Sequence, residues 1–97
     1  MYNQAVYTQG AIPKAPFYVT STDRFMSGWG ASRGKNNRLI FPCSTLAEAE
    51  RVEAYALRRS DQMNVRIASR KPRLNLTANL YQLMLKADCG AWYGGAA

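Results

Sequence analysis

The segment 45–60 constrains the fold of this chain most strongly, because it carries a full set of helix signals. Its first residues, Thr45 to Glu48, form a capping box, in which the two side chains satisfy backbone amides at the start of the helix. Acidic residues follow in the first half, and Arg58 and Arg59 stand in the last turn, as the helix dipole favours. The apolar residues recur at helical spacing: Leu46, Ala49, Val52, Tyr55 and Ala56. We therefore predict one amphipathic helix, whose apolar side must be covered by other elements.

Three other segments have the composition or the alternation of strands. Residues 17–22 are rich in aromatic and β-branched side chains, and residues 38–43 form a second apolar run. Residues 63–68 alternate apolar and polar side chains, with the cations on one face. Between the first two strands lie three glycines and two consecutive asparagines, so we expect a hairpin with a long loop. Pro42 lacks an amide donor, which places the second strand at a sheet edge or ends it there.

The N-terminal residues 1–16 show no secondary-structure period, and two prolines interrupt them. We expect an irregular N-terminal arm, which apolar residues such as Val6 and Ile12 could still pin to the domain. The C-terminal residues 91–97 are expected to form a flexible tail, although Trp92 could dock. The domain between them, residues 17–90, is predicted to be a single unit.

Residues 74–90 are open to two interpretations. Leucines and a methionine from 76 to 84 recur at helical spacing, which predicts a second helix capped by Asn75 or Thr77. A strand through 74–77 is the alternative. With the helix, the element order is β-β-α-β-(α). This order indicates an α+β fold, in which one main helix packs on a small antiparallel sheet of about three strands.

The residue types argue against catalysis. The chain has no histidine, two cysteines and six carboxylates, whereas acid–base catalysis near neutral pH usually needs a histidine or a tuned carboxylate pair. Cys43 has no histidine to activate it, and Cys43 and Cys89 lack metal-ligand spacing, so we expect no enzyme, metal or cofactor site. Both thiols are expected to be reduced and buried, with one disulfide as the alternative. Without a signal-peptide pattern or a long apolar run, the chain is expected to be cytoplasmic, with no membrane partner.

Thirteen Lys and Arg residues give a net charge of +7, which points to an anionic partner, most often nucleic acid. One candidate interface is the loop after the first strand, where Trp29 stands between glycines. Its ring could stack on a base, a contact worth about 1–3 kcal/mol, while nearby cations hold the phosphates. These cations are Arg24, Arg33, Lys35 and Arg38. In the alternative interpretation, Phe25, Met26 and Trp29 fold back to cover one end of the sheet.

The second candidate interface follows the third predicted strand. Its cations are Arg66, Arg70, Lys71 and Arg73. Because no acidic residue occurs from 62 to 87, these four side chains form a plausible phosphate-contact patch. The alternative is a solvated sheet edge, on which cations prevent strand-to-strand aggregation.

A specific run, Phe-Met-Ser-Gly-Trp-Gly, occupies residues 25–30. Together with the stretches 17–20, 22–24, 34–41 and 47–53, it resembles a family of small, mostly uncharacterised proteins encoded by tailed bacteriophages. The resemblance covers roughly residues 17–71 and implies a viral origin, without an activity.

Two functions fit these features. The first is a small basic, non-enzymatic phage accessory protein that binds nucleic acid or a host nucleoprotein complex through a cationic face. Because no sequence-reading motif is present, such binding should be weakly specific. The alternative is a phage-encoded inhibitor or adaptor that docks on a host protein, for example an anti-defence protein such as an anti-CRISPR. Both would act in the cytoplasm of the host cell.

Overall fold

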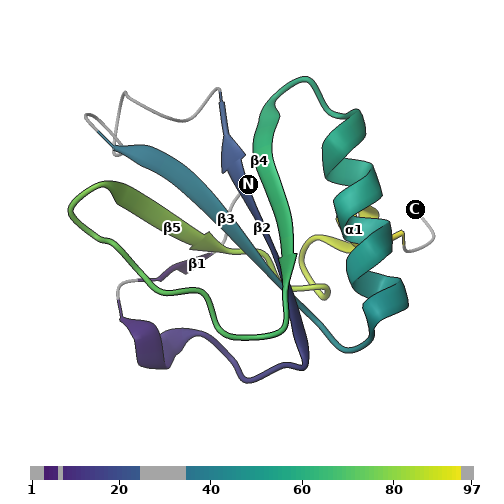
Figure 1. Cartoon of the computed structure of the whole chain (residues 1–97), viewed down its shortest axis with the longest axis horizontal. Coiled ribbons are helices and arrows are strands. Elements are labelled where there is room, and N and C mark those ends of the chain that lie inside the picture. The colour runs from purple at the N-terminus through teal and green to yellow at the C-terminus, as the bar shows by residue number, and fades with distance from the viewer. Residues whose placement is uncertain (1–3, 7, 25–34, 95–97) are drawn as a thin grey trace.

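The computed structural model describes residues 4–6, 8–24 and 35–94. Within them, five strands form one sheet on which one α-helix packs, so the fold is α+β, as predicted (Figure 1). The elements are β1 (Gln4–Ala5), the 3-10 turn η1 (Gln9–Ala11), β2 (Phe17–Asp23), β3 (Asn36–Cys43), α1 (Leu46–Arg58), β4 (Gln62–Ala68), β5 (Asn79–Leu83) and the short 3-10 helix η3 (Gly90–Tyr93).

The strand order across the sheet is β1-β5-β3-β2-β4. Strand β2 pairs antiparallel with β3 and β4, and β1 pairs antiparallel with β5. Strands β3 and β5, in contrast, are parallel. The sheet is therefore mixed and larger than the small antiparallel sheet that the sequence predicts, although the predicted hairpin of β2 and β3 is confirmed.

Helix α1 begins at its predicted cap. Thr45 Oγ1 accepts a hydrogen bond from Glu48 N at 3.0 Å. The carboxylate of Glu48 accepts from the backbone amide of Ser44 at 2.9 Å, one residue earlier than a standard capping box requires. One orphan amide of the first turn and the amide of Ser44 just before the cap are thus satisfied, which explains why the helix begins here.

The side of the sheet that α1 and η3 cover, called here the helix side, carries the larger core. Buried Ala49, Val52 and Ala56 of α1 pack with Val19 of β2 and Phe41 of β3. The small alanine side chains let the helix lie close to the sheet. Residues Val19 and Phe41 are also direct cross-strand partners, so the register of the hairpin aligns the apolar residues that the helix needs.

The opposite side of the sheet, called here the arm side, has a second core. Tyr18, Ile40 and Tyr81 contribute from the strands, and Val6 and Ile12 contribute from the N-terminal arm. The central strands are therefore buried on both faces, because odd and even positions enter different cores. The pinning of the arm by its apolar residues is confirmed for Val6 and Ile12.

The Tyr18 hydroxyl fastens the arm to the sheet. It donates to Pro13 O at 2.7 Å and accepts from Ala15 N at 2.8 Å. Because this short turn of the arm contains prolines, it cannot supply its own regular hydrogen bonds. The tyrosine replaces them.

The predicted second helix is wrong. The segment instead forms β5, which lies beside β3 from Asn36↔Asn79 to Ile40↔Leu83. In this conformation Tyr81 and Leu83, two residues apart on the strand, both enter the arm-side core. Pairing with β3 and burial against the arm therefore override the local helical pattern. The alternative strand through 74–77 is also wrong, because the strand starts later.

The flexible tail predicted for 91–97 is wrong at Tyr93, whereas the docking of Trp92 is confirmed, because both side chains are buried in the helix-side core. The Tyr93 ring lies 6.0 Å from that of Phe41, and its hydroxyl lies 2.5 Å from the Met84 carbonyl oxygen. Aromatic burial thus orders a glycine-flanked segment that has no sequence period of its own. In the described part of the chain, no helix is long and apolar enough to cross a membrane.

Candidate nucleic-acid interface

Only part of the first predicted interface lies within the residues that the structure describes. Trp29 and Arg33 lie outside the described residues, so the predicted base stacking and its alternative are both untested. Arg24 and Lys35 are exposed and stand at the two ends of that segment. The backbone amide of Arg24 donates to Asp61 O at 2.7 Å, which places the end of β2 beside the turn between α1 and β4.

Arg38 belongs with the second predicted interface rather than with the first. On β3 it stands opposite Thr22 of β2, while Arg66 on β4 stands opposite Thr20. Thr20 and Thr22 share one face of β2 with Tyr18, so both arginines lie on the arm side of the sheet. One Arg38 guanidinium nitrogen donates to Thr22 Oγ1 at 3.0 Å, which fixes the side chain across the strand.

A β-bulge in β4 sets the position of Arg66. The register with β2 shifts between Thr20 and Thr22, and Asn64 in the bulge has a left-handed backbone with φ of 55°. Asparagine tolerates this conformation better than most residues do. The bulge places Arg66 opposite Thr20, on the same face as Arg38. Strand β4 is also an edge of the sheet, as the alternative interpretation of its cations requires.

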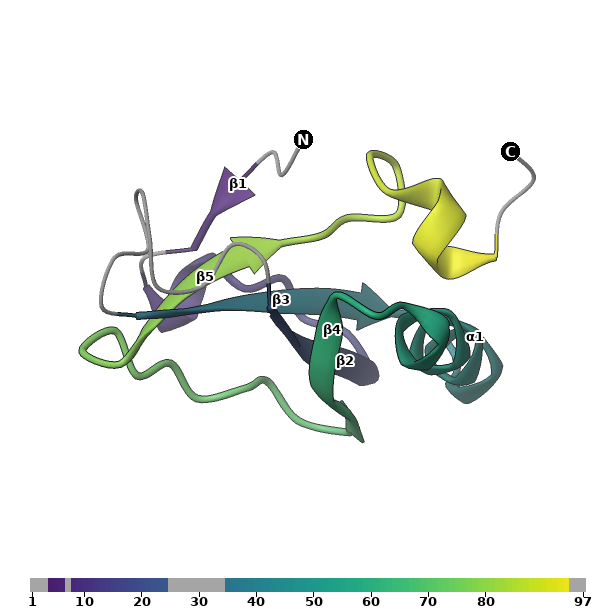
Figure 2. The same cartoon turned by 90° about the horizontal axis from the view of Figure 1, so that it is seen from above.

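The loop 69–78 connects β4 to β5 and carries three exposed cations: Arg70, Lys71 and Arg73. Strand β4 is an edge of the sheet, and β5 lies beyond β2 and β3 in the strand order. To reach β5, this loop therefore crosses over β2 and β3. Figure 2 shows it running along one side of the sheet, with the C-terminal segment on the other side. Leu74 of the loop packs against the arm-side core. The loop that carries these cations therefore lies on the same side of the sheet as Arg38 and Arg66.

The loop is fastened at two points by neutral hydrogen bonds. Gln9 of the arm donates through Nε2 to Pro72 O and accepts from Leu74 N at 3.0 Å. The Tyr81 hydroxyl accepts from Asn75 N at 2.9 Å. One side-chain amide thus pairs with the loop backbone as a neighbouring strand would. The cations project from an ordered frame, which lowers the entropy lost when a ligand binds.

An open hollow of about 440 Å³ lies between the arm and the loop. Its lining consists of Gln9, Lys71, Arg73 and Leu74. Sequence reasoning named the two cations but missed Gln9, because nothing in its neighbourhood signals a role. Its partner Pro72 is 63 residues away along the chain. Tyr81 was missed for a related reason, since it was assigned to a predicted helix.

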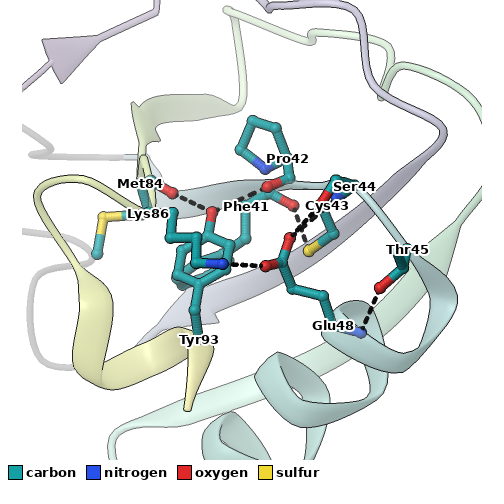
Figure 3. A network of polar contacts seen from close by, with 9 residues as sticks. All are labelled: Phe41, Pro42, Cys43, Ser44, Thr45, Glu48, Met84, Lys86 and Tyr93. Atoms are coloured by element: carbon teal, nitrogen blue, oxygen red, sulfur yellow. Dashed lines mark hydrogen bonds and ion pairs between the residues drawn. The ribbon is translucent and has the colours of Figure 1, made fainter. Parts of the chain in front are cut away.

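The ion pairs of the described residues lie elsewhere, on the helix side. Lys86 Nζ lies 2.7 Å from Glu48 Oε2 in a polar network at the start of α1 (Figure 3). Arg59 and Asp61 form the other pair at 2.7 Å. Arg59 also stacks on Trp92, with its guanidinium carbon 4.4 Å from the ring centroid. These two cations are compensated by carboxylates, and neither belongs to the predicted interface.

The carboxylates of these pairs have lowered pKa values. For Glu48 the main cause is the hydrogen bond from Lys86, followed by the Ser44 amide. For Asp61 the main cause is the bidentate hydrogen bond from Arg59, which also raises the pKa of Arg59. Each charged form is favoured by its partner, so these groups act in the fold as fixed charges.

Both cysteines are free thiols, as predicted, but the prediction that both are buried is right only for Cys43. Cys43 is buried in the helix-side core, where its Sγ lies 3.4 Å from Phe41 O. Burial, and next the negative charge of Glu48, raise the pKa of Cys43 to about 11. Burial likewise raises the pKa of Cys89, which is only half-buried. Thiols with raised pKa values are poor nucleophiles at neutral pH, because the reactive thiolate is scarce.

Comparison with protein-family models, with curated proteins and with solved structures finds no match for this chain. The resemblance to tailed-bacteriophage proteins therefore stays a prediction.

Proposed function

We propose that this chain is a small non-enzymatic protein that binds nucleic acid through a cationic face on the arm side of the sheet. The cationic face consists of Arg38, Arg66, Arg70, Lys71 and Arg73. One observation carries the proposal: cations distant in sequence share one side of the sheet, on a strand face and a fastened loop. In keeping with the sequence resemblance, we further propose that it is a phage accessory protein of the host cytoplasm.

The cationic face suits contacts to phosphates. Neither ion pair of the described part of the chain includes one of its residues, so its positive charge is available to a ligand. Exposed Lys and Arg side chains that neutralise phosphates release condensed counterions, which supplies most of the affinity in non-specific binding. Arginine adds planar, bidentate hydrogen bonding to phosphate oxygens.

Base-specific recognition is not expected. Helix α1 uses its apolar face to cover the sheet, and its exposed Glu50 would repel a phosphate backbone. The cationic face lies on a sheet and a loop, and its five members are Lys and Arg side chains that suit phosphate groups. The proposed complex is therefore led by backbone contacts and depends weakly on sequence.

The proposal is tested by measuring affinity for a mixed-sequence oligonucleotide at increasing salt, with the wild type and the variant R70S/K71S/R73S. We expect the wild-type affinity to fall steeply with salt, and the slope to become shallower by roughly one per lost phosphate contact in the variant. A matched control, R51S/R58S, removes two exposed cations from α1 and should bind nearly as the wild type does. Binding that is absent, or unchanged by salt, would refute the proposal.

The alternative function, docking on a host protein, is tested by a second measurement. The chain is used to capture partners from host lysate before and after nuclease treatment. Under the proposal, capture is lost when nucleic acid is digested. A protein partner that is retained on the wild type and lost on R70S/K71S/R73S would show instead that the cationic face serves an inhibitor or adaptor.

A further inference from the structure

We infer that the hollow between Gln9 and the loop 69–78 receives one nucleotide of a single-stranded nucleic acid, with its phosphate at Lys71 and Arg73. The inference rests on the proposed function and names the part of the nucleic acid that the site takes. The hollow has a volume of about 440 Å³, within the range of about 300–1,000 Å³ that is usual for small-molecule sites.

The lining of the hollow offers donors to a ligand. Lys71 and Arg73 provide cationic N–H groups, and the lining contains no carboxylate. The Gln9 oxygen accepts from Leu74 N, and one hydrogen of its Nε2 is donated to Pro72 O. Because a side-chain amide has two N–H hydrogens, the second remains for a ligand. Two cations and a neutral donor around one concavity match the acceptor oxygens of a single phosphate group.

Leu74 supplies an apolar wall beside these donors. Its side chain is half-buried and packs against the arm-side core, so its position is fixed. A sugar or base attached to the bound phosphate would meet this wall. The lining therefore combines an anion site with an apolar contact, as a nucleotide requires.

The shape of the hollow favours a single strand over a duplex. A duplex presents its phosphates on a convex surface and keeps its bases stacked inside, so it can contact the rim of a concavity but cannot enter it. A single strand can turn one base and its sugar out of the strand and insert them. Loop fastening by Gln9 and Tyr81 keeps the hollow open before the ligand arrives.

The test compares a fluorescein-labelled single strand with a duplex of the same sequence, using the wild type, K71S/R73S and R66S/R70S. Both variants remove two exposed cations from the cationic face, but only the first changes the hollow. We expect the wild type to prefer the single strand by about tenfold and K71S/R73S to lose that preference. We expect R66S/R70S to bind both forms more weakly while it keeps the preference.

Two further arms identify the bound group. Adenosine monophosphate should displace the single strand from the wild type at lower concentration than inorganic phosphate does, because only the nucleotide reaches Leu74. The variant Gln9→Glu places a negative charge in the hollow and removes a donor, so it should also abolish the preference for the single strand. Thermal melting verifies that each variant is folded.

Equal wild-type affinity for single strand and duplex, or equal effects of K71S/R73S and R66S/R70S, would overturn the inference while leaving the proposed function intact. Absence of salt-sensitive binding to either form would refute the proposed function itself, and the inference with it.

Discussion

The two sides of the sheet differ in how their polar groups are satisfied. On the helix side, two ion pairs join polar groups beside the core: Glu48 with Lys86, and Asp61 with Arg59. On the arm side, the fastenings are neutral, through the hydroxyls of Tyr18 and Tyr81 and the side-chain amide of Gln9. The arm side thus holds a long connection in place without using carboxylates.

This difference explains how a small protein can be both ordered and strongly cationic. Carboxylates placed beside the loop 69–78 would order it, but they would also cancel the charge that it carries. Neutral hydrogen bonds give the order and leave the cations available. The two sides are therefore expected to respond differently to substitution, with stability governed by the helix side and binding by the arm side.

The largest expected effect on stability is in the helix-side core. Phe41 is fully buried, and its ring lies 5.1 Å from that of Trp92 and 6.0 Å from that of Tyr93. The substitution Phe41→Ala should lower the free energy of unfolding by about 3–5 kcal/mol, because it removes these contacts and leaves a cavity. Urea denaturation measures this loss. The control Leu57→Ala, at a site 65% exposed, should change stability by no more than about 0.5 kcal/mol.

A smaller effect is expected at the polar network of Figure 3. Glu48 is buried and accepts hydrogen bonds from Ser44 and Lys86. The isosteric substitution Glu48→Gln should cost about 1–3 kcal/mol at pH 7, because it removes charge-assisted hydrogen bonds and leaves buried groups unsatisfied. Glu50→Gln, on the exposed side of α1, is the matched control and should have little effect.

The same substitution changes the response to acid. The folded pKa of Glu48 is lowered, so its contribution to stability is complete above the unfolded carboxyl pKa of about 4.3. That contribution is lost as the pH falls through the lower folded pKa, because the unfolded state binds the proton first. The loss of stability between pH 5 and acid should therefore be shallower in Glu48→Gln than in the wild type. Equal slopes would show that the Glu48–Lys86 pair does not contribute.

The smallest effect is expected at the bulge that positions Arg66. Asn64 has φ of 55°, so Asn64→Gly should be neutral or stabilise slightly, and Asn64→Ala should destabilise by about 1 kcal/mol. Thermal unfolding of the two variants measures the difference. If alanine were as stable as glycine, the left-handed backbone would not constrain this position, and the bulge would not hold Arg66 opposite Thr20.

Local patterns predicted the elements whose stabilising contacts are close in sequence. The cap at Thr45 and Glu48 lies within one helical turn, and it gives α1 where it was expected. The same patterns failed for β5, because the leucines in and before it recur at helical spacing. Only the parallel pairing with β3, some forty residues earlier in the chain, decides between the two.

The candidate interface was also predicted in part. Its five cations were all named from the sequence, because charge and the absence of nearby carboxylates are visible there. Arg38, however, was grouped with the Trp29 loop, since adjacency in sequence was the only guide. Its place beside Thr22, on the same face as Arg66, follows from strand register, which is set by the apolar residues of two cores.

The sequence by itself determined a basic α+β chain with one capped helix, two reduced thiols and an excess of cations, because composition and short-range spacing carry that information. Tertiary structure alone decided that Trp92 and Tyr93 belong to the core and that Gln9 reaches a loop 63 residues away. It also placed Arg38 and Arg66 on one face of the sheet, on the side opposite the helix. The physical reason is that contacts between distant segments depend on which side chains pack against each face of the sheet. A local sequence pattern does not carry that information.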